Sequence, residues 1–223
     1  QFQISHFQFR VSNFHFRAMS TLNTVLDLVA FLYALAFFPA PFFWLVIHPA
    51  VDFWRRQGTR AYGAALLVWV GLGALLVVFR PAIFAQRVGR NAFTGILGTA
   101  LVVLAIWLNR HVHRQFSLRR LIGMPELTPQ RGRGAVVCSG IYAYVRHPRY
   151  LEFMVSFVGL ALLTGAAGIF ALAIVTILMY LIVAPLEERE LRDHYGTEYE
   201  AYAREVPRFI PGLRRKTRPP ISP

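Results

Sequence analysis

The most constraining feature of this sequence is an uncharged, apolar run of 34 residues, 153–186, with charged residues at both ends. At about 1.5 Å per residue, a single helix of this length would be much longer than the ~30 Å hydrocarbon core of a bilayer. A turn-permissive segment, Thr164-Gly165-Ala166-Ala167-Gly168, lies near its middle. We therefore predict two short antiparallel membrane helices joined by a tight turn, with both ends on one membrane face.

This hairpin would bring together polar residues that are far apart in the sequence. Arg146, His147 and Tyr150 precede the apolar run, and Glu187 and Glu188 follow it. Because both ends of a helical hairpin emerge on the same side, we expect these side chains to share one rim. Cationic donors and carboxylates would then meet at the mouth of an apolar slot.

The composition places the rest of the chain in a membrane as well. Of the 223 residues, 56% are hydrophobic, which gives room for several spans in one domain and for little else. The formal net charge of +13 could indicate nucleic-acid binding, but the basic residues flank hydrophobic segments, where arginine is attracted to anionic membrane lipids. We therefore expect membrane lipids as partners, and no nucleic acid.

A metal site is not expected. Cys138 is the only cysteine, which excludes an intrachain disulfide and a cysteine-rich zinc site. No second histidine or cysteine stands at a ligand spacing from His147.

Three further spans are predicted before the hairpin, at residues 24–47, 62–79 and 93–108, which gives five in total. Pro39 and Pro41 should kink or break the first of them. The second is rich in glycine and alanine, which let membrane helices approach closely, so we expect it to pack inside the bundle. The predicted fold is an all-α integral membrane bundle.

The distribution of arginine predicts the orientation. Residues 110–149 are rich in arginine, whereas the turn at 164–168 carries no charge, so the positive-inside rule places the former in the cytoplasm and the latter outside it. The loop between the second and third spans conflicts with this topology, because it carries Arg80, Arg87 and Arg90. The predominance of arginine over lysine points to a GC-rich bacterial genome, and hence to the bacterial inner membrane.

The two ends of the chain are expected to differ from the bundle. Residues 1–18 alternate apolar and polar side chains, as an exposed strand does, and we interpret them as an extension outside the functional domain, which would comprise residues 19–211. Residues 212–223, rich in proline and basic side chains, should form a flexible tail.

The segment before that tail, residues 185–211, predicts a bent amphipathic lid that folds over the cytoplasmic mouth of the bundle or lies on the membrane surface. An apolar and aromatic stripe recurs at helical spacing, at Leu191, Tyr195, Tyr199, Tyr202 and Val206. The first lid helix would open at Pro185 and end at Gly196. Thr197 and Glu200 fit a capping box that opens the second helix.

The rim residues also have purely structural interpretations. Glu187 and Glu188 could simply favour the N-terminus of the helix opening at Pro185, with Glu188 paired to Arg192 one turn later. Arg146 could lie in an ordinary interfacial turn and extend to lipid headgroups. The density of aromatic, cationic and acidic side chains in residues 142–152 favours a binding site instead.

The order of these motifs resembles the isoprenylcysteine carboxyl methyltransferase family, whose core is shared with the phospholipid methyltransferases. The matching pattern begins with Gly140-x-Tyr142-x-x-x-Arg146-His147-Pro148-x-Tyr150-Leu151, continues with the apolar hairpin and Glu187-Glu188, and ends with Tyr195-Gly196-x-Glu198-Tyr199-x-x-Tyr202-x-x-x-Val206-Pro207-Arg208-Phe209-x-Pro211. It covers about a third of the chain, residues 140–211. The combination in this order is specific, whereas the Arg-His-Pro motif alone would be weak.

The resemblance implies a membrane methyltransferase that uses S-adenosyl-L-methionine at the cytoplasmic face and receives a lipophilic or lipid-linked acceptor from the membrane. In the family these motifs line the cofactor pocket; carried onto this chain, they are Arg146, His147, Pro148, Tyr150, Glu187 and Glu188. To this set we add Gly140, Tyr142 and Val145 from the same motif. Four residues are expected to contact the substrate, namely Glu152, Tyr199, Tyr202 and Arg208.

The resemblance favours O-methylation of a carboxylate like that of prenylcysteine. Phospholipid N-methylation and a non-catalytic, lipid-binding or scaffold protein of the same fold are the alternatives. Two departures weigh against prenylcysteine itself: Glu152 stands where the family often has glycine and should add negative charge at the pocket entrance, and residues 181–186 include no basic side chain. A thiol or amine acceptor would need a proton acceptor, for which His147 and Tyr150 are the first candidates.

Overall fold

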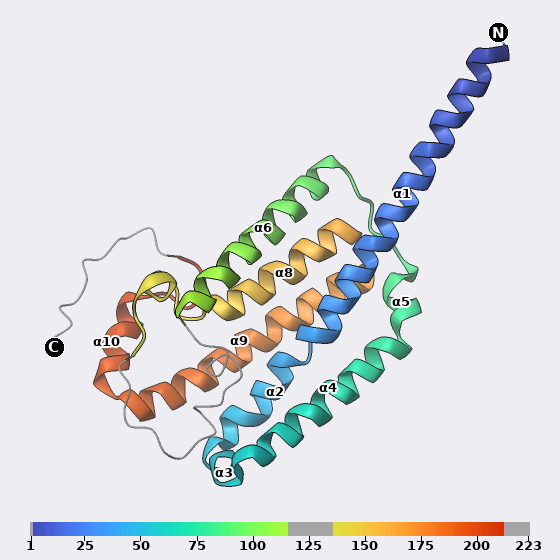
Figure 1. Ribbon diagram of the computed structural model, residues 1–223. Helices are drawn as coiled ribbons and strands as arrows, with labels where there is room; N and C mark the ends of the chain where they lie inside the picture. Colours follow the sequence, from blue (N-terminus) through green and yellow to red (C-terminus); the bar gives the residue numbers. More distant parts are fainter. Residues whose placement is uncertain (1, 116–135, 212–223) are drawn as a thin grey trace.

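The computed structural model describes residues 2–115 and 136–211, and the regular elements in these two ranges are helices. The prediction of an all-α bundle is confirmed. The principal helices are α1 (Phe2–Phe37), α2 (Ala40–Ile47), α4 (Ala61–Val78), α6 (Ala92–Gln115), α8 (Pro148–Thr164) and α9 (Ala167–Tyr195). The shorter α3 (Val51–Gln57), α5 (Arg80–Ala85) and α10 (Thr197–Glu205) lie at the two ends of this bundle (Figure 1). Short 3-10 turns occupy His48–Ala50, Gly58–Arg60 and Gly140–Ala143.

In the described ranges, four helical segments are long and apolar enough to span a membrane: Ser20–Gln57, Ala61–Val78, Ala92–Arg114 and Ala167–Tyr195. The fifth predicted span is α8, which has 17 residues. At ~1.5 Å per residue it would extend about 25 Å, at the short end of what crosses a bilayer. The chain is an integral membrane protein.

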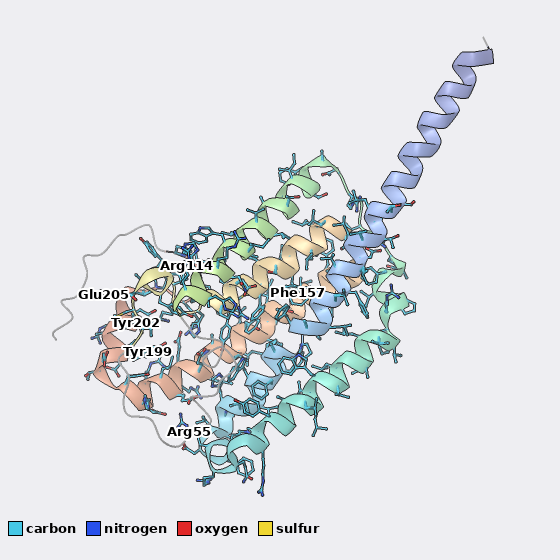
Figure 2. The ribbon with its side chains drawn as sticks, in the orientation of Figure 1. Arg55, Arg114, Phe157, Tyr199, Tyr202 and Glu205 are labelled. Carbon is cyan, nitrogen blue, oxygen red and sulfur yellow. The ribbon has the colours of Figure 1, made fainter. Side chains whose placement is uncertain are left out.

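The predicted hairpin is present, with α8 and α9 side by side and antiparallel in the middle of the bundle (Figure 1). Its turn is tight because Gly165 adopts a φ of +64°, a conformation that residues with a side chain rarely adopt. A Cβ atom at Gly165 would also lie 2.9 Å from the carbonyl oxygen of Val88. The hairpin packs against α1 through a core that includes Ala34, Ala161 and Phe157, and Figure 2 shows Phe157 among the helices.

The first predicted span is broken at its prolines, as expected: α1 ends at Phe37 and α2 starts at Ala40. The strand-like interpretation of residues 1–18 is wrong, because α1 already begins at Phe2. A helix satisfies its backbone hydrogen bonds locally, whereas a strand without a partner cannot. The first part of α1 extends beyond the other helices (Figure 1), and its exclusion from the functional domain stays a prediction.

The expectation that the second span packs inside the bundle is wrong. Only 11% of the α4 span is buried, and no atom would contact a Cβ placed at Gly63 or Gly71. The close approach of backbones occurs between α6 and α8, where a Cβ at Gly98 would lie 3.0 Å from the carbonyl oxygen of Gly159. Small residues therefore mark a helix contact only where a second helix packs against them, as α8 does at Gly98.

The arginines between the second and third spans bind within the protein. Both terminal nitrogens of Arg87 donate to the carboxylate of Asp27, at 2.8 and 2.5 Å, and one of them also donates to the carbonyl of Thr164 at 3.0 Å. Arg90 donates to the carbonyl of Leu163 at 2.9 Å. These two carbonyls end α8, where the helix dipole favours a cation. Protein groups thus compensate two of the three charges that conflict with the positive-inside rule.

The lid is built differently from the prediction. Helix α9 continues through Pro185 to Tyr195, so no new helix opens there. Gly196 ends α9, as predicted, with a φ of +58°. The capping box is not formed, because Gly196 takes the N-cap position of α10 and Thr197 is already helical. The predicted flexible tail, 212–223, lies outside the described residues.

Candidate functional site

The site lies at the end of the bundle where α9 carries Glu187 and Glu188, next to α10. The segment after α10 pairs with the turn that precedes α8: the amide of Arg146 donates to the carbonyl of Pro207 at 2.9 Å, and the amide of His147 donates to the carbonyl of Arg208 at 3.1 Å. These bonds fix the Arg-His-Pro turn against the C-terminal segment.

Two tyrosines of α10 complete this connection. The hydroxyl of Tyr202 donates to the carbonyl of Tyr142 at 2.7 Å, and Tyr199 is almost fully buried. Figure 2 shows both on α10 at the end of the bundle. The lid therefore rests on the rim through its aromatic stripe.

Glu188 is the centre of the site. It is fully buried and its carboxylate contacts four cationic side chains. Arg208 binds it through two nitrogens at 2.8 Å each, Arg146 lies at 3.0 Å, His147 at 3.1 Å and Arg192 at 3.2 Å. One carboxylate thus joins the turn before α8, the end of α9 and the segment after α10. The predicted pair of Glu188 and Arg192 is present, but as one of four contacts.

His147 lies between the two glutamates. Its Nδ1 atom is 3.1 Å from Glu187 and its Nε2 atom 3.1 Å from Glu188. Burial by itself lowers the pKa of this imidazole, but the two carboxylates raise it by more, so the pKa lies above its usual value. Both ring nitrogens can donate only in the protonated form. The two carboxylates therefore favour the protonated, cationic form of His147.

An open cleft of about 420 Å³ borders this cluster, within the size range of small-molecule sites. It is lined by Arg146, Glu188, Arg192, Glu200, Ala203, Arg204 and Arg208. Arg204 and Glu200 are exposed. The lining offers cations for a carboxylate or phosphate, and carboxylates for an ammonium or a hydroxyl.

The structure brings some of the predicted site residues to the cleft and places others behind it. Arg146, Glu188 and Arg208 line the cleft. Six others lie in the rim, within or beside the same loop and helix ends: Gly140, Tyr142, Val145, His147, Pro148 and Glu187. Val145, His147 and Pro148 are buried. Their roles toward a cofactor stay predictions.

A stack of aromatic rings leads from the rim into the bundle. The ring of Tyr150 stacks on His147, with centroids 5.2 Å apart, and on Tyr180, at 4.5 Å. Tyr180 in turn stacks on Phe153 at 5.8 Å. Tyr180 lies in the middle of α9 and is fully buried. Tyr180 is not among the predicted site residues, because its position within the long apolar run masks its hydroxyl.

Glu152 is not at the pocket entrance. Its carboxylate is buried one turn into α8. The Tyr33 hydroxyl donates to one of its oxygens at 3.4 Å, and Arg149 lies 3.4 Å from the other. The helical turn after Pro148 directs this residue toward Tyr33 of α1, and its expected contact with the substrate stays a prediction.

A second ion-pair cluster was missed entirely. Glu190 on α9 binds Nδ1 of His48 at 3.0 Å and a terminal nitrogen of Arg55 at 2.5 Å. His48 is buried and stacks on Trp44, with centroids 5.1 Å apart. Glu190 lies one helical turn from Glu187, but nothing in that spacing indicates its distant partners. This cluster joins α2 and α3 to the helix that carries the site.

Comparisons with known proteins identify the family of this chain. Residues 93–198 match the family model described as phospholipid methyltransferase. A methanethiol S-methyltransferase of Mycobacterium tuberculosis is 34% identical over 175 residues, which are 74% of this chain and 70% of the relative. The chain belongs to the membrane methyltransferase family that includes the phospholipid and isoprenylcysteine carboxyl methyltransferases.

Other relatives match over shorter regions. A methanethiol S-methyltransferase of Crocosphaera subtropica is 32% identical over 139 residues, 60% of this chain and 52% of the relative. A protein-S-isoprenylcysteine O-methyltransferase of Schizosaccharomyces pombe is 37% identical over 79 residues, 34% of this chain and 33% of the relative. The chain spans about half or less of the length of several of these relatives. No solved structure matches it significantly.

Proposed function

We propose that this methyltransferase takes its methyl group from S-adenosylmethionine held at the charged cleft, and transfers it to a small lipophilic acceptor, for which a thiol is the best-supported class. The observation that carries the proposal is the Glu188 cluster beside an open cleft of suitable size. The same residues belong to the motifs that the resemblance assigns to the cofactor.

The residues present fit this cofactor by their chemistry. Arg204 and Arg208 would hold its carboxylate, and Glu200 would accept from its ammonium or its ribose hydroxyls. Two buried polar atoms beside the cleft, Nε of Arg146 and the hydroxyl of Tyr199, have no hydrogen-bond partner within the described ranges and are available to a ligand. Bound there, the cofactor would supply an already activated methyl group, so that the protein has chiefly to position the reactants and exclude water.

The acceptor class is supported by the names of the relatives. Methanethiol S-methyltransferases of several bacteria match the chain. Protein-S-isoprenylcysteine O-methyltransferases also match, over about a third of it, and these keep prenylcysteine O-methylation as the second candidate. Exposed apolar faces on α4 and α6 allow a lipophilic acceptor to approach through the bilayer.

Calorimetry of the detergent-solubilised protein with S-adenosylhomocysteine tests the cofactor. Arg204 is suited to mutation because it is exposed and lines the cleft, so Arg204→Gln should leave the fold intact. Losing one charge-assisted hydrogen bond should weaken binding about tenfold. Arg56→Gln, an exposed arginine on α3, is the matched control. An absence of binding at millimolar ligand, or equal affinities for the three proteins, would contradict the proposal.

Labelled cofactor then tests the acceptor. The enzyme is incubated with 1-hexanethiol, with a prenylcysteine analogue and with phosphatidylethanolamine in separate reactions. We expect label in the hexyl methyl sulfide. Preferential labelling of the prenylcysteine ester or of the phospholipid would refute a thiol as the acceptor and identify the labelled compound's class instead.

A further inference from the structure

A layer of polar side chains lies inside the bundle, about two helical turns from the Glu188 cluster. Tyr180 precedes Glu188 by eight residues on the same helix, a rise of about 12 Å. The layer draws on four helices: Tyr33 from α1, Asn109 from α6, Glu152 and Ser156 from α8, and Thr176 and Tyr180 from α9. Polar groups at this depth have no bulk water to bind, which makes them costly and usually functional.

Several members of the layer contact one another. Tyr33 donates to Glu152 at 3.4 Å and also hydrogen-bonds Ser156. Asn109 of α6 also hydrogen-bonds Glu152. These bonds hold one oxygen of the Glu152 carboxylate among α1, α6 and α8.

Three atoms of the layer remain without a hydrogen bond in the part of the chain that the structure describes. They are the hydroxyls of Thr176 and Tyr180, both on fully buried residues, and Oε2 of Glu152, which has only the Arg149 guanidinium 3.4 Å away. Leaving a buried hydroxyl unpaired costs about 1–3 kcal/mol. Thr176 and Tyr180 are one turn apart on the same face of α9. A ligand with its own hydrogen-bonding head would satisfy these groups.

The layer is continuous with the rim. Tyr180 stacks on Tyr150, which stacks on His147 of the Glu188 cluster. On its other side the layer borders the apolar rings of Phe37 and Phe153, whose centroids are 5.3 Å apart. A polar and an apolar environment therefore adjoin each other inside the bundle, which matches the two parts of a molecule with a polar head and a short apolar body.

We infer that this layer binds the head of the methyl acceptor, a thiol, with Tyr180 and Thr176 as hydrogen-bonding groups and Glu152 as proton acceptor. The inference rests on the proposed function. In this step the S–H bond breaks, its electron pair stays on sulfur, and an O–H bond forms on the Glu152 carboxylate. A carboxylate acceptor would instead face a second carboxylate in a low-dielectric site and be repelled.

The first test measures acceptor binding without the cofactor. Thermal unfolding of the full chain in detergent is followed with 1-hexanethiol, hexyl methyl sulfide or hexanoate. The thiol should raise the unfolding temperature, and the other two should not. Tyr180→Phe, which keeps the ring stack, should abolish the shift, whereas Tyr62→Phe on the peripheral α4 should retain it. Equal shifts for the three compounds, or an unchanged shift in Tyr180→Phe, would overturn the inference.

The second test isolates the proton. With 1-hexanethiol, Glu152→Gln should lower turnover about 100-fold or more, as expected for a lost general base. With an aryl thiol that is already ionised at the assay pH, the same variant should stay within a few-fold of the native enzyme. Equal losses with both thiols would assign Glu152 a structural role and refute the inference.

Failure of the proposed function is recognised separately. Calorimetry with S-adenosylhomocysteine is run on the native protein and on Glu152→Gln, and both should bind it alike. Absent binding to the native protein would overturn the cofactor assignment. The thermal shift with 1-hexanethiol would still test independently whether the layer binds a thiol.

Discussion

Replacing Glu188 by glutamine tests whether this one carboxylate holds the end of the bundle together. The substitution keeps the shape and one acceptor oxygen but removes the negative charge. Arg192 and Arg208 are 41% and 36% exposed, so water would solvate them again at little cost. Arg146 and His147 are only 11% and 5% exposed. These two cations would lose their shared counter-charge while staying largely buried.

The size of the effect follows from the two buried cations. Removing one partner of a buried ion pair costs about 3–5 kcal/mol. The glutamine keeps one acceptor oxygen, and the neighbouring Glu187 still faces His147. We therefore expect the free energy of unfolding to fall by about 3 kcal/mol, near the lower end of this range. For a chain of this length, that corresponds to a fall in unfolding temperature of roughly 6–12 °C.

Thermal unfolding in detergent micelles, followed by tryptophan fluorescence, measures this change. Glu200→Gln is the matched control, because Glu200 lines the same cleft but is exposed and should unfold within about 1 °C of the native protein. A difference of less than about 2 °C between Glu188→Gln and the native protein would be well below the shift expected for buried ion pairs. Such a result would show that the cluster does not stabilise the fold.

Two further predictions concern pH and packing. The pKa of His147 is higher in the folded than in the unfolded chain. Protonated His147 should therefore stabilise the fold fully below its unfolded pKa, and this stabilisation should be lost as the pH rises through the folded pKa. His147→Gln should remove that part of the pH dependence of the unfolding temperature, and an unchanged profile would contradict this role of His147. A Cβ at Gly168 would lie 2.4 Å from the backbone of α5, so Gly168→Ala should destabilise by about 1–3 kcal/mol. Gly71→Ala, with open space around it, should be neutral or slightly stabilising by thermal unfolding, and equal effects of the two substitutions would refute the packing argument.

The hairpin could be predicted because its signals are local. A run too long for one crossing, with Gly165 near its middle, allows few other solutions. The convergence of His147 with Glu187 and Glu188 then followed from topology. The prediction that a new helix opens at Pro185 was wrong, although proline is a local signal for a helix start. Helix α9 continues through Pro185, because a membrane helix tolerates the loss of one backbone hydrogen bond.

The interior of the bundle was harder to predict because side-chain direction decides it. Tyr180 and Thr176 counted as part of an apolar run, although their hydroxyls lie buried in a polar layer. Glu152 was recognised as unusual, but its place one turn into α8 depends on where the helix begins. The His48 cluster joins residues more than 130 positions apart, and no sequence pattern indicates such a pairing.

The contact of Arg87 with Asp27 bears on how the protein is made. Asp27 precedes Arg87 in the chain, so both partners of this contact are synthesised before the hairpin of α8 and α9. The Thr164 carbonyl, which completes the contact, emerges much later. Neutralisation can therefore begin with the early helices and does not have to wait for the finished bundle. A count of positive charges that ignores this internal pairing overstates the net charge that the loop carries in the folded protein.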